Sequence, residues 1–302
     1  MNTFLEQWII AVVLLHTWGA KSPKVCFTTT MYLGIDIGGT KTLLARITTD
    51  GTIEETLKFP TPQDYAQFLA ELRDNVTKIT TEPWQLVASS APGKIDRTTG
   101  TGIVFGNLPW QNVPLRDDIA AITGTEVLIE NDVKLAGLSE ARAIDPIPHK
   151  TLYVTFSTGV SDGIVVDGVI DPELQDSEAG HMLFEKDGKL VTWESFASGK
   201  AITAKYGKFA SEIDDEATWR EITQDMALGL YALIADVQPD IIVVGGGVGS
   251  HFHKYGQYLT ETLKSHEDPM VTIPPIIGAK RAEEAVIYGC YELMKDYQAN
   301  NG

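Results

Sequence analysis

The stretch LGIDIGGTK, residues 33–41, decides which fold and chemistry to expect from this chain. An apolar strand ends in Asp36, and the tight pair Gly38-Gly39 follows it. Paired glycines allow a hairpin turn to bring backbone N–H groups against an anion. Asp36 can hold a metal ion through water beside that anion, while Thr40 and Lys41 can donate hydrogen bonds to it. The stretch therefore predicts a phosphate-binding hairpin in a nucleotide-handling enzyme, with an ordinary Gly-Gly hairpin as the alternative.

The composition is that of a soluble globular chain. Its 302 residues are 43% hydrophobic and 22% charged, which provides ample core for two domains. The net charge of −17 argues against a nucleic-acid partner, because no basic surface is available to displace counterions from phosphates. The two cysteines, Cys26 and Cys290, form neither a disulfide framework nor a metal-ligand cluster and suit a reducing cytoplasm.

The first thirty residues differ from the rest. Residues 8–18 are apolar apart from His16, but this run is too short to span a bilayer. The basic region that opens a signal peptide is missing before it. Because Met31 stands directly before the first predicted strand, we expect residues 1–30 to be an upstream extension outside the fold. A short membrane-associating segment is the alternative.

Hydrophobic periodicity predicts two similar halves. In the first half we expect strands at 33–37, 43–48, 52–59, 86–90 and 127–130, with helices at 63–80, 113–123 and 134–143. The pattern restarts with strands at 151–156, 163–166, 169–170 and 241–244, and helices at 192–206, 218–237 and 283–297. Two βββαβα halves predict a duplicated architecture with a cleft between them and a hinge near residues 130–134.

A second polar stretch, END at residues 130–132, directly follows a predicted strand. The Asp132 carboxylate at the strand tip can accept a proton from a hydroxyl group, and the Asn131 amide beside it can fix the orientation of that hydroxyl. An Asn-Asp helix cap is the alternative.

Three further stretches fit the opening motif. TFSTGVSDG, residues 155–163, has the form of a second phosphate hairpin, or else of a plain serine- and glycine-bearing turn. EAGH, residues 178–181, with Glu194 downstream, offers carboxylate and imidazole groups that can clamp vicinal hydroxyls, as in a sugar; a solvated turn is the alternative. The run Gly245-Gly246-Gly247 ends an apolar strand and leaves room for a base or a ribose.

Together these motifs resemble those of the ROK family of sugar kinases, within the actin/hexokinase fold superfamily. The resemblance covers residues 31–298, and the order and spacing of the short motifs make it specific. The matching stretches are DIGGTK (36–41), APG (91–93), GNLPW (106–110), END (130–132), STG (157–159), EAGH (178–181), WES (193–195) with SG (198–199), and GGG (245–247).

The resemblance implies an α/β fold made of duplicated actin-like (ribonuclease H-like) ATPase domains with an interdomain cleft. The expected domains are residues 31–130 with 284–300, and residues 131–283. ATP and Mg²⁺ are the implied cofactors, and a sugar and a nucleotide are the implied small-molecule ligands. The resemblance also suggests a homodimer. We expect a cytoplasmic protein with neither a nucleic-acid nor a membrane partner.

The resemblance also assigns roles to residues. Asp132 stands at the position of the catalytic base. Sugar-contacting positions are Asn107, Asn131, Asp132, Glu178, His181 and Glu194. Gly38, Gly39, Thr40 and Lys41, with Asp36, belong to the first phosphate loop, Thr158 and Gly159 to the second, and Gly245, Gly246 and Gly247 to the adenosine site.

The chain departs from the family pattern at two places. Many members bind structural zinc through a His and a Cys-rich stretch, but residues 184–193 contain no cysteine, so no structural zinc is expected. His181 would then be held by hydrogen bonds, and packing of Leu190, Trp193 and Phe196 would stabilise the segment. In the second hairpin, Ser161 and Asp162 occupy glycine positions. We expect Asp162 to point to solvent, because a carboxylate facing a polyphosphate is repulsive.

The activity that these observations favour is ATP-dependent phosphorylation of a hexose 6-hydroxyl, with glucose as the first candidate substrate. One alternative is an N-acetylhexosamine or N-acetylmannosamine kinase on the same scaffold. Another is a catalytically weakened sugar-binding regulator, which the Ser161-Asp162 pair suggests.

Overall fold

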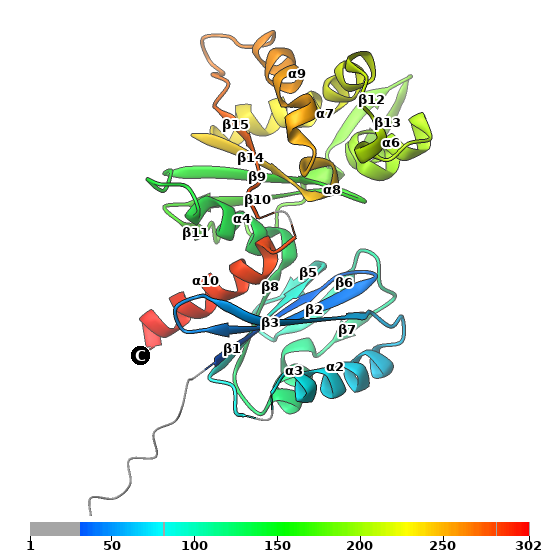
Figure 1. Cartoon of the computed structure of the whole chain (residues 1–302). Helices are drawn as coiled ribbons and strands as arrows, with labels where there is room; N and C mark the ends of the chain where they lie inside the picture. Colours follow the sequence, from blue (N-terminus) through cyan, green and yellow to red (C-terminus); the bar gives the residue numbers. More distant parts are fainter. Residues whose placement is uncertain (1–30, 81, 282, 302) are drawn as a thin grey trace, which may run out of the picture. The chain divides into compact units, whose positions relative to one another are not determined.

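The structure is a computed structural model that describes residues 31–80, 82–281 and 283–301 (Figure 1). The predicted extension at residues 1–30 lies outside the described residues. We found two five-stranded sheets in the described part, together with smaller sheets of two and three strands.

The first large sheet has the strand order β3-β2-β1-β4-β8. Strands β1, β2 and β3 are antiparallel, whereas β4 and β8 run parallel to β1. Alternate residues of β1 face opposite sides, so Leu33 and Ile35 pack toward α2 and α3 while Tyr32 packs toward α10. The elements are β1 (Met31–Ile37), β2 (Lys41–Thr48), β3 (Ile53–Pro60), α2 (Tyr65–Ile79), β4 (Leu86–Ala91), α3 (Leu115–Thr123), β8 (Val127–Asn131) and α10 (Ala285–Asn301).

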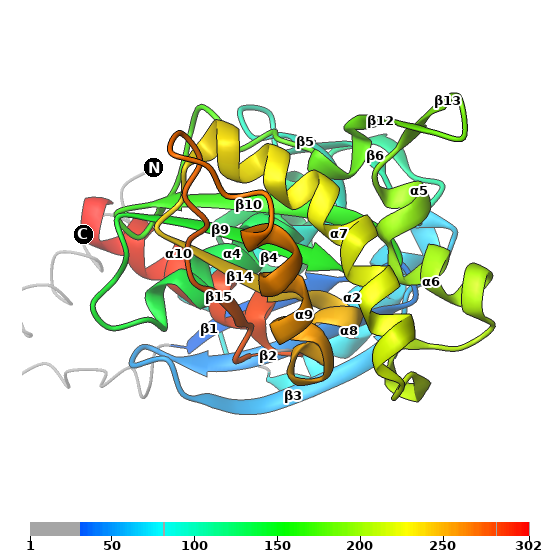
Figure 2. The same cartoon turned by 90° about the horizontal axis from the view of Figure 1, so that it is seen from above.

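The second large sheet repeats this plan, with the order β11-β10-β9-β14-β15. Three antiparallel strands again adjoin two parallel ones. Figure 2 shows α7 and α9 lying across this sheet, and α4 packs against β9 and β10. The elements are α4 (Asp132–Arg142), β9 (Lys150–Phe156), β10 (Val160–Val166), β11 (Val169–Ile170), α7 (Glu216–Val237), β14 (Ile241–Gly245), α9 (Phe252–Lys264) and β15 (Ile276–Gly278).

Helices α4 and α10 pack on each other, so the C-terminal helix connects the first sheet with the helix that covers the second (Figure 1). Strand β8 runs directly into α4, so no loop separates Asn131 from Asp132. The predicted α/β fold with duplicated actin-like halves is confirmed by this repeated sheet order.

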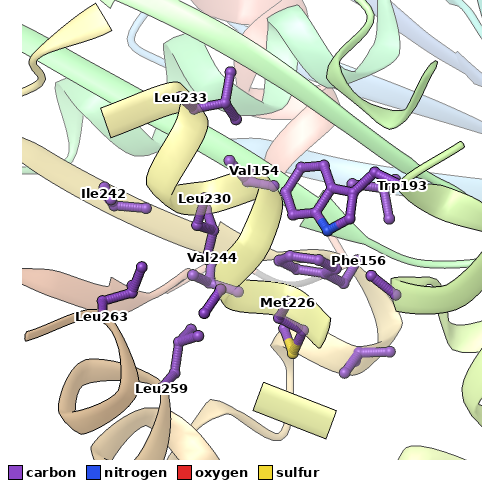
Figure 3. Close-up of a cluster of buried hydrophobic side chains, with 14 of the residues drawn as sticks. Val154, Phe156, Trp193, Met226, Leu230, Leu233, Ile242, Val244, Leu259 and Leu263 are labelled. Carbon is purple, nitrogen blue, oxygen red and sulfur yellow. The ribbon is translucent and has the colours of Figure 1, made fainter. Parts of the chain in front are cut away.

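A buried apolar cluster holds the second sheet to its helices (Figure 3). Trp193 is fully buried there, with its ring 5.4 Å from that of Phe156 and perpendicular to it. Its indole N–H donates to the Asp225 carbonyl at 3.1 Å. A Cβ on Gly229 of α7 would lie 2.2 Å from the Trp193 ring, so only glycine fits beneath it. Trp193 therefore fixes the start of the following helix, α5 (Glu194–Ala197), against α7.

Several small elements were not predicted from the sequence. They are β5 (Gly93–Asp96), β6 (Thr101–Phe105), β7 (Gln111–Val113), η1 (Ala179–His181), β12 (Leu183–Lys186), β13 (Lys189–Thr192), η2 (Ala210–Glu212), α8 (Gly246–Gly249) and β15, and the longer helix α9 was missed as well.

The helix predicted over residues 192–206 is wrong as a single element. Two helices, α5 (Glu194–Ala197) and α6 (Gly199–Tyr206), take its place. Ser198 has extended backbone angles and its hydroxyl accepts from the Ala201 N–H, so it caps α6 and ends the turn before it.

Candidate active site

Asp36 lies near the carboxyl end of β1, next to the same end of β4. The Ser90 hydroxyl donates to Asp36 Oδ1 at 2.9 Å and accepts from the Ile37 N–H at 2.9 Å. Burial raises the pKa of Asp36, although the Ser90 hydrogen bond and the charge of Lys58 act in the opposite direction. Ser90 therefore fixes the carboxyl group, and it was not predicted as a site residue. The only sequence signal for it was a serine pair at the end of a buried strand.

The first hairpin has the geometry that its glycines predict. The Gly38 N–H donates to the Lys41 carbonyl at 3.0 Å and closes the turn. A Cβ on Gly39 would lie 2.6 Å from Asn107 Cβ. Thr40, Lys41 and Asn107 are exposed. The hairpin therefore presents its polar groups to solvent with Asn107 packed directly against it.

Asn131 caps helix α4, so the helix-cap alternative is confirmed for this residue. Its Oδ1 accepts from the backbone N–H groups of Val133 at 2.9 Å and Lys134 at 3.2 Å. Its Nδ2 donates to the Gly93 carbonyl at 3.1 Å. The Asn131 amide thus orients the start of α4, where Asp132 is the first residue.

Asp132 has an unusual electrostatic environment. Burial, the charge of Asp36 and the charge of Glu178 raise its pKa to about 7, against a weaker lowering by the Val133 N–H. The Asp132 Oδ1 accepts from that N–H at 3.0 Å. The Asp36 and Glu178 carboxyl groups are thus close enough to Asp132 for their charges to raise its pKa. A carboxylate with a pKa near neutrality suits general base catalysis.

Glu178 is an exposed residue just before η1. Its Oε2 accepts from the Ser161 hydroxyl at 3.3 Å. Partial burial of the carboxyl group raises the pKa of Glu178. The charge of Lys134 lowers this pKa, and the charge of Asp162 raises it. The charge of His181 also lowers it, so this exposed imidazole lies near Glu178. The His181 backbone N–H donates to the Glu178 carbonyl at 3.0 Å.

Glu194 lies against the second hairpin. A Cβ on Gly159 would lie 2.7 Å from Glu194 Oε2, and one on Gly180 would lie 3.5 Å from Glu194 Cβ. The Gly199 N–H donates to the Ser157 carbonyl at 2.7 Å. The second hairpin, the EAGH segment and Glu194 are therefore in mutual contact, and the exposed Thr158 lies at the hairpin tip.

The glycine run at the end of β14 adjoins the same hairpin. Gly246 has φ +80°, and a Cβ there would lie 2.4 Å from Thr155 Oγ1 and 2.6 Å from the Phe156 carbonyl. A Cβ on Gly245 would collide with the Tyr153 ring, whereas one on Gly247 would meet nothing within 4 Å. The run thus packs closely on β9 and leaves open space at Gly247. A separate groove of about 800 Å³, lined by α7 and α9, contains none of the predicted site residues.

The expectation that Asp162 points to solvent is wrong. Asp162 is fully buried. Its Oδ2 accepts from the Ser177 hydroxyl at 2.6 Å, and its Oδ1 accepts from the Ala179 N–H at 2.8 Å. The reason is that β10 begins at Val160, so Ser161 and Asp162 belong to the strand and the turn is confined to 157–159. Asp162 then faces inward, away from any phosphate at the turn.

The packing predicted for the segment after His181 is confirmed only in part. Trp193 is buried and Phe196 packs perpendicular to Phe184 at 6.0 Å, but Leu190 is 70% exposed on the β12–β13 hairpin. Among residues 31–80, 82–281 and 283–301, no three or more His, Cys, Asp or Glu side chains form a group that could hold a metal ion.

Two charged residues that sequence reasoning missed lie next to the site. Arg97 donates through Nε to Glu130 Oε2 at 2.8 Å and through Nη1 to Asp176 Oδ1 at 2.6 Å. Lys134 is 2% exposed on α4. Its only sequence signal was a lysine among the small and apolar residues of the stretch 133–138. No helix in the described part of the chain is long and apolar enough to cross a membrane.

Comparison with known proteins agrees with the fold. The family model described as "ROK family" matches residues 32–297. A putative fructokinase of Bacillus subtilis is 28% identical over 261 residues, covering 78% of this chain and 84% of its own. An N-acetyl-D-glucosamine kinase of Haemophilus influenzae is 26% identical over 301 residues, covering 87% of this chain and 99% of its own.

A solved structure gives the same result for the fold. The ROK family glucokinase of Streptomyces griseus, in complex with glucose and AMPPNP, superposes with a TM-score of 0.72 at 22% identity, covering 87% of this chain and 98% of that one. The family match spans most of the chain, and the structural likeness extends over the same region. The chain therefore belongs to the ROK family of sugar kinases.

Proposed function

We propose that this protein transfers the γ-phosphoryl group of ATP to the 6-hydroxyl of a hexose, with glucose as the first candidate. The observation that carries the proposal is Asp132, a carboxyl group with a pKa of about 7 that shares its site with Asp36 and Glu178. Two glycine hairpins and the carboxylates suited to sugar hydroxyls adjoin that site. The relatives named above, which include a glucokinase, support this class of reaction.

In the proposed reaction, Asp132 accepts the proton of the 6-hydroxyl as that oxygen attacks the γ-phosphorus in line. A new P–O bond to the sugar forms while the bond to the β-phosphate oxygen breaks, and ADP leaves with the electron pair. Phosphoryl transfer needs mainly positioning and charge stabilisation. Lys41 and the N–H groups of the two hairpins supply donors for the phosphates, and Glu178, Glu194 and Asn107 offer partners for the sugar hydroxyls.

The carboxyl groups also fit a divalent cation. The charge of Asp36 raises the pKa of Asp132, and a cation between their oxygens would offset that repulsion. Mg²⁺ is commonly bound through one or two carboxylates together with waters and phosphate oxygens. Asp36 and Asp132 would hold it, and it would supply charge neutralisation for the transferred group.

We further propose that residues 31–130 with 284–300, and residues 131–283, form two domains whose closure excludes water. Packing of α10 on the first sheet supports the return of the C-terminal helix to the first domain. Water would otherwise compete with the sugar hydroxyl as the nucleophile.

A second candidate substrate class is an N-acetylated hexosamine. The similarity to an N-acetyl-D-glucosamine kinase favours it. The weakened-regulator alternative loses the support of the Ser161-Asp162 pair, because Asp162 is buried and accepts from the Ser177 hydroxyl and the Ala179 N–H.

The test is an assay of phosphate transfer from MgATP to glucose, mannose, fructose, N-acetylglucosamine and N-acetylmannosamine, with GTP and polyphosphate as alternative donors. Turnover on glucose at the highest kcat/KM supports the first candidate. Preference for an acetylated sugar would replace glucose by the second candidate. Lack of transfer to every sugar would contradict the proposed function.

A further inference from the structure

Two buried charges next to the site take no part in the proposed chemistry. Lys134 is 2% exposed and Asp162 is fully buried. Burying a charged group is costly unless hydrogen bonds replace its water. The contacts of these two side chains therefore indicate what they are built to hold.

The Lys134 ammonium group has three protons and three acceptors. Its Nζ donates to the Asp162 carbonyl, to the Ser177 carbonyl at 2.8 Å and to the Ser177 hydroxyl at 3.0 Å. Each proton is therefore satisfied by a residue of the second sheet or of the segment that follows it. Lys134 itself lies on α4, two residues after Asp132.

The Asp162 carboxylate binds the same segment through two further hydrogen bonds. Its Oδ2 accepts from the Ser177 hydroxyl at 2.6 Å and its Oδ1 accepts from the Ala179 N–H at 2.8 Å. The ammonium and the carboxylate thus meet at Ser177, and the residues immediately before and after Glu178 are both held.

We propose that Lys134, Asp162 and Ser177 form a positioning network that fixes the backbone around Glu178 relative to the helix that carries Asp132. The inference rests on the proposed function in one respect: it takes a sugar hydroxyl as the partner of Glu178. Neither Lys134 nor Asp162 touches the substrate in this account. They keep the sugar-binding carboxylate and the base at a constant separation, because misplacement by about 1 Å can cost on the order of 10²-fold in rate.

The experiment compares Asp162→Ala with Asp162→Asn and Ser177→Ala in the full chain. Asp162→Ala removes both acceptors, whereas the Asn side chain keeps an oxygen that accepts from the Ala179 N–H and places an amide NH2 donor opposite the Ser177 hydroxyl, which must then accept. The matched control is Arg142→Gln. Arg142 also lies on α4 and makes partly exposed ion pairs, to Glu292 at 2.8 Å and Asp296 at 2.6 Å, at the opposite end of the helix.

The first readout is amide hydrogen exchange of the peptide that covers residues 175–182. Asp162→Ala should accelerate exchange there by about tenfold or more, Asp162→Asn should stay near the wild type, and Arg142→Gln should leave this peptide unchanged. This measurement does not depend on catalysis, so it tests the network even if the wild type transfers phosphate to no sugar.

The second readout is steady-state kinetics on the best sugar. Asp162→Ala should raise the sugar KM about tenfold with little change in the KM for MgATP, and Ser177→Ala should raise the sugar KM by a smaller factor. Asp162→Asn should restore most of the loss. The inference is overturned if Asp162→Ala exchanges like the control, or if both KM values rise together. Failure of the proposed function would instead appear as absent transfer by the wild type.

Discussion

At the scale of single residues, Asp132 links the structure to a pH dependence. Its raised pKa of about 7 means that the free enzyme carries the ionised base only above that pH. Because a general base must be ionised, we expect kcat/KM to fall about tenfold per pH unit as the pH drops below 7. The check is the profile of kcat/KM for MgATP between pH 5 and 9 at saturating hexose, because that ratio reports the enzyme before the cation binds.

The charge of Asp36 makes the same profile testable by mutation. Since that charge helps to raise the pKa of Asp132, Asp36→Asn should shift the acidic limb to lower pH, besides reducing kcat. A limb that stays in place or moves to higher pH would show that Asp36 does not set the ionisation of Asp132.

The raised pKa of Asp132 also predicts that its ionised form lowers the stability of the folded protein. Its pKa in the folded protein lies above the ordinary aspartate value of 3.8, so folding disfavours the ionised form, and the protein loses stability as the pH rises from about 4 to about 7. At pH 8, Asp132→Asn should therefore have a higher free energy of unfolding than the wild type, by an amount on the order of 1–2 kcal/mol after allowance for partial exposure. At pH 5 the difference should shrink. Equal destabilisation at both pH values would contradict the assignment.

Single residues also show where sequence reasoning succeeds. The hydrophobic pattern places Asp36 near the end of a predicted strand and Asp132 directly after another, whereas Glu178 precedes the short helix η1, which was not predicted. Asp162 was misplaced, since its orientation depends on whether β10 begins at Val160 or at Gly163, and a shift of strand register reverses the side a residue faces. The bonds of Lys134 join positions 28 and 43 residues away, which no local pattern can report.

At the scale of elements, the first hairpin predicts a sharp steric test. A methyl group on Gly39 would overlap Asn107, whereas one on the neighbouring Gly106 would meet nothing within 4 Å. Gly39→Ala should therefore displace Asn107 or the turn and raise the KM for sugar or MgATP by about tenfold, because overpacking costs about 1–3 kcal/mol. Gly106→Ala is the matched control and should differ little in kinetics. Equal effects of the two substitutions would refute the packing argument.

The elements that were predicted share a clear periodicity. Helix α2 presents Phe68, Leu72 and Val76 to the first sheet at helical spacing. Strand β1 is apolar or aromatic except at Gly34 and Asp36, because both of its faces are covered. The short strands β5 to β7 and the β12–β13 hairpin bury few side chains, so their sequences carry little alternation. The division of residues 192–206 was missed because the Ser198 cap lies within a run of helix-compatible residues.

At the scale of the whole described chain, a salt-bridge network joins segments that are far apart in sequence. Arg97 bonds to Glu130 before α4 and to Asp176 before the Glu178 segment. Glu130 is only 6% exposed, so its charge depends on Arg97. Arg97→Met should lower the free energy of unfolding by about 3 kcal/mol, because it leaves a buried carboxylate unpaired. Replacing both residues by Met should recover much of that loss, as measured by urea denaturation.

The contrary result for this pair would be a double variant as unstable as the sum of its single variants. That outcome would mean that Arg97 and Glu130 stabilise the protein separately. The interpretation of Arg97 as the partner that allows Glu130 to be buried next to Asn131 would then be wrong.

The duplicated plan could be inferred from the sequence because the strand-rich pattern restarts after residue 150. The repeated sheet order confirms it, and the family match confirms the resemblance. The packing of α4 on α10 could not be inferred in the same way, since it joins helices more than a hundred residues apart. The domain bounds remain a prediction.

The most direct test of the central claim is identification of the product formed by the full chain from MgATP and a hexose. Phosphorus and proton nuclear magnetic resonance can locate the new phosphate ester, while calorimetry measures hexose binding to the wild type and to Asp132→Asn. The account predicts a hexose 6-phosphate from the wild type, and an Asp132→Asn variant that binds the hexose but transfers phosphate about 10²–10⁴-fold more slowly. Phosphorylation at another hydroxyl, or undiminished transfer by Asp132→Asn, would contradict it.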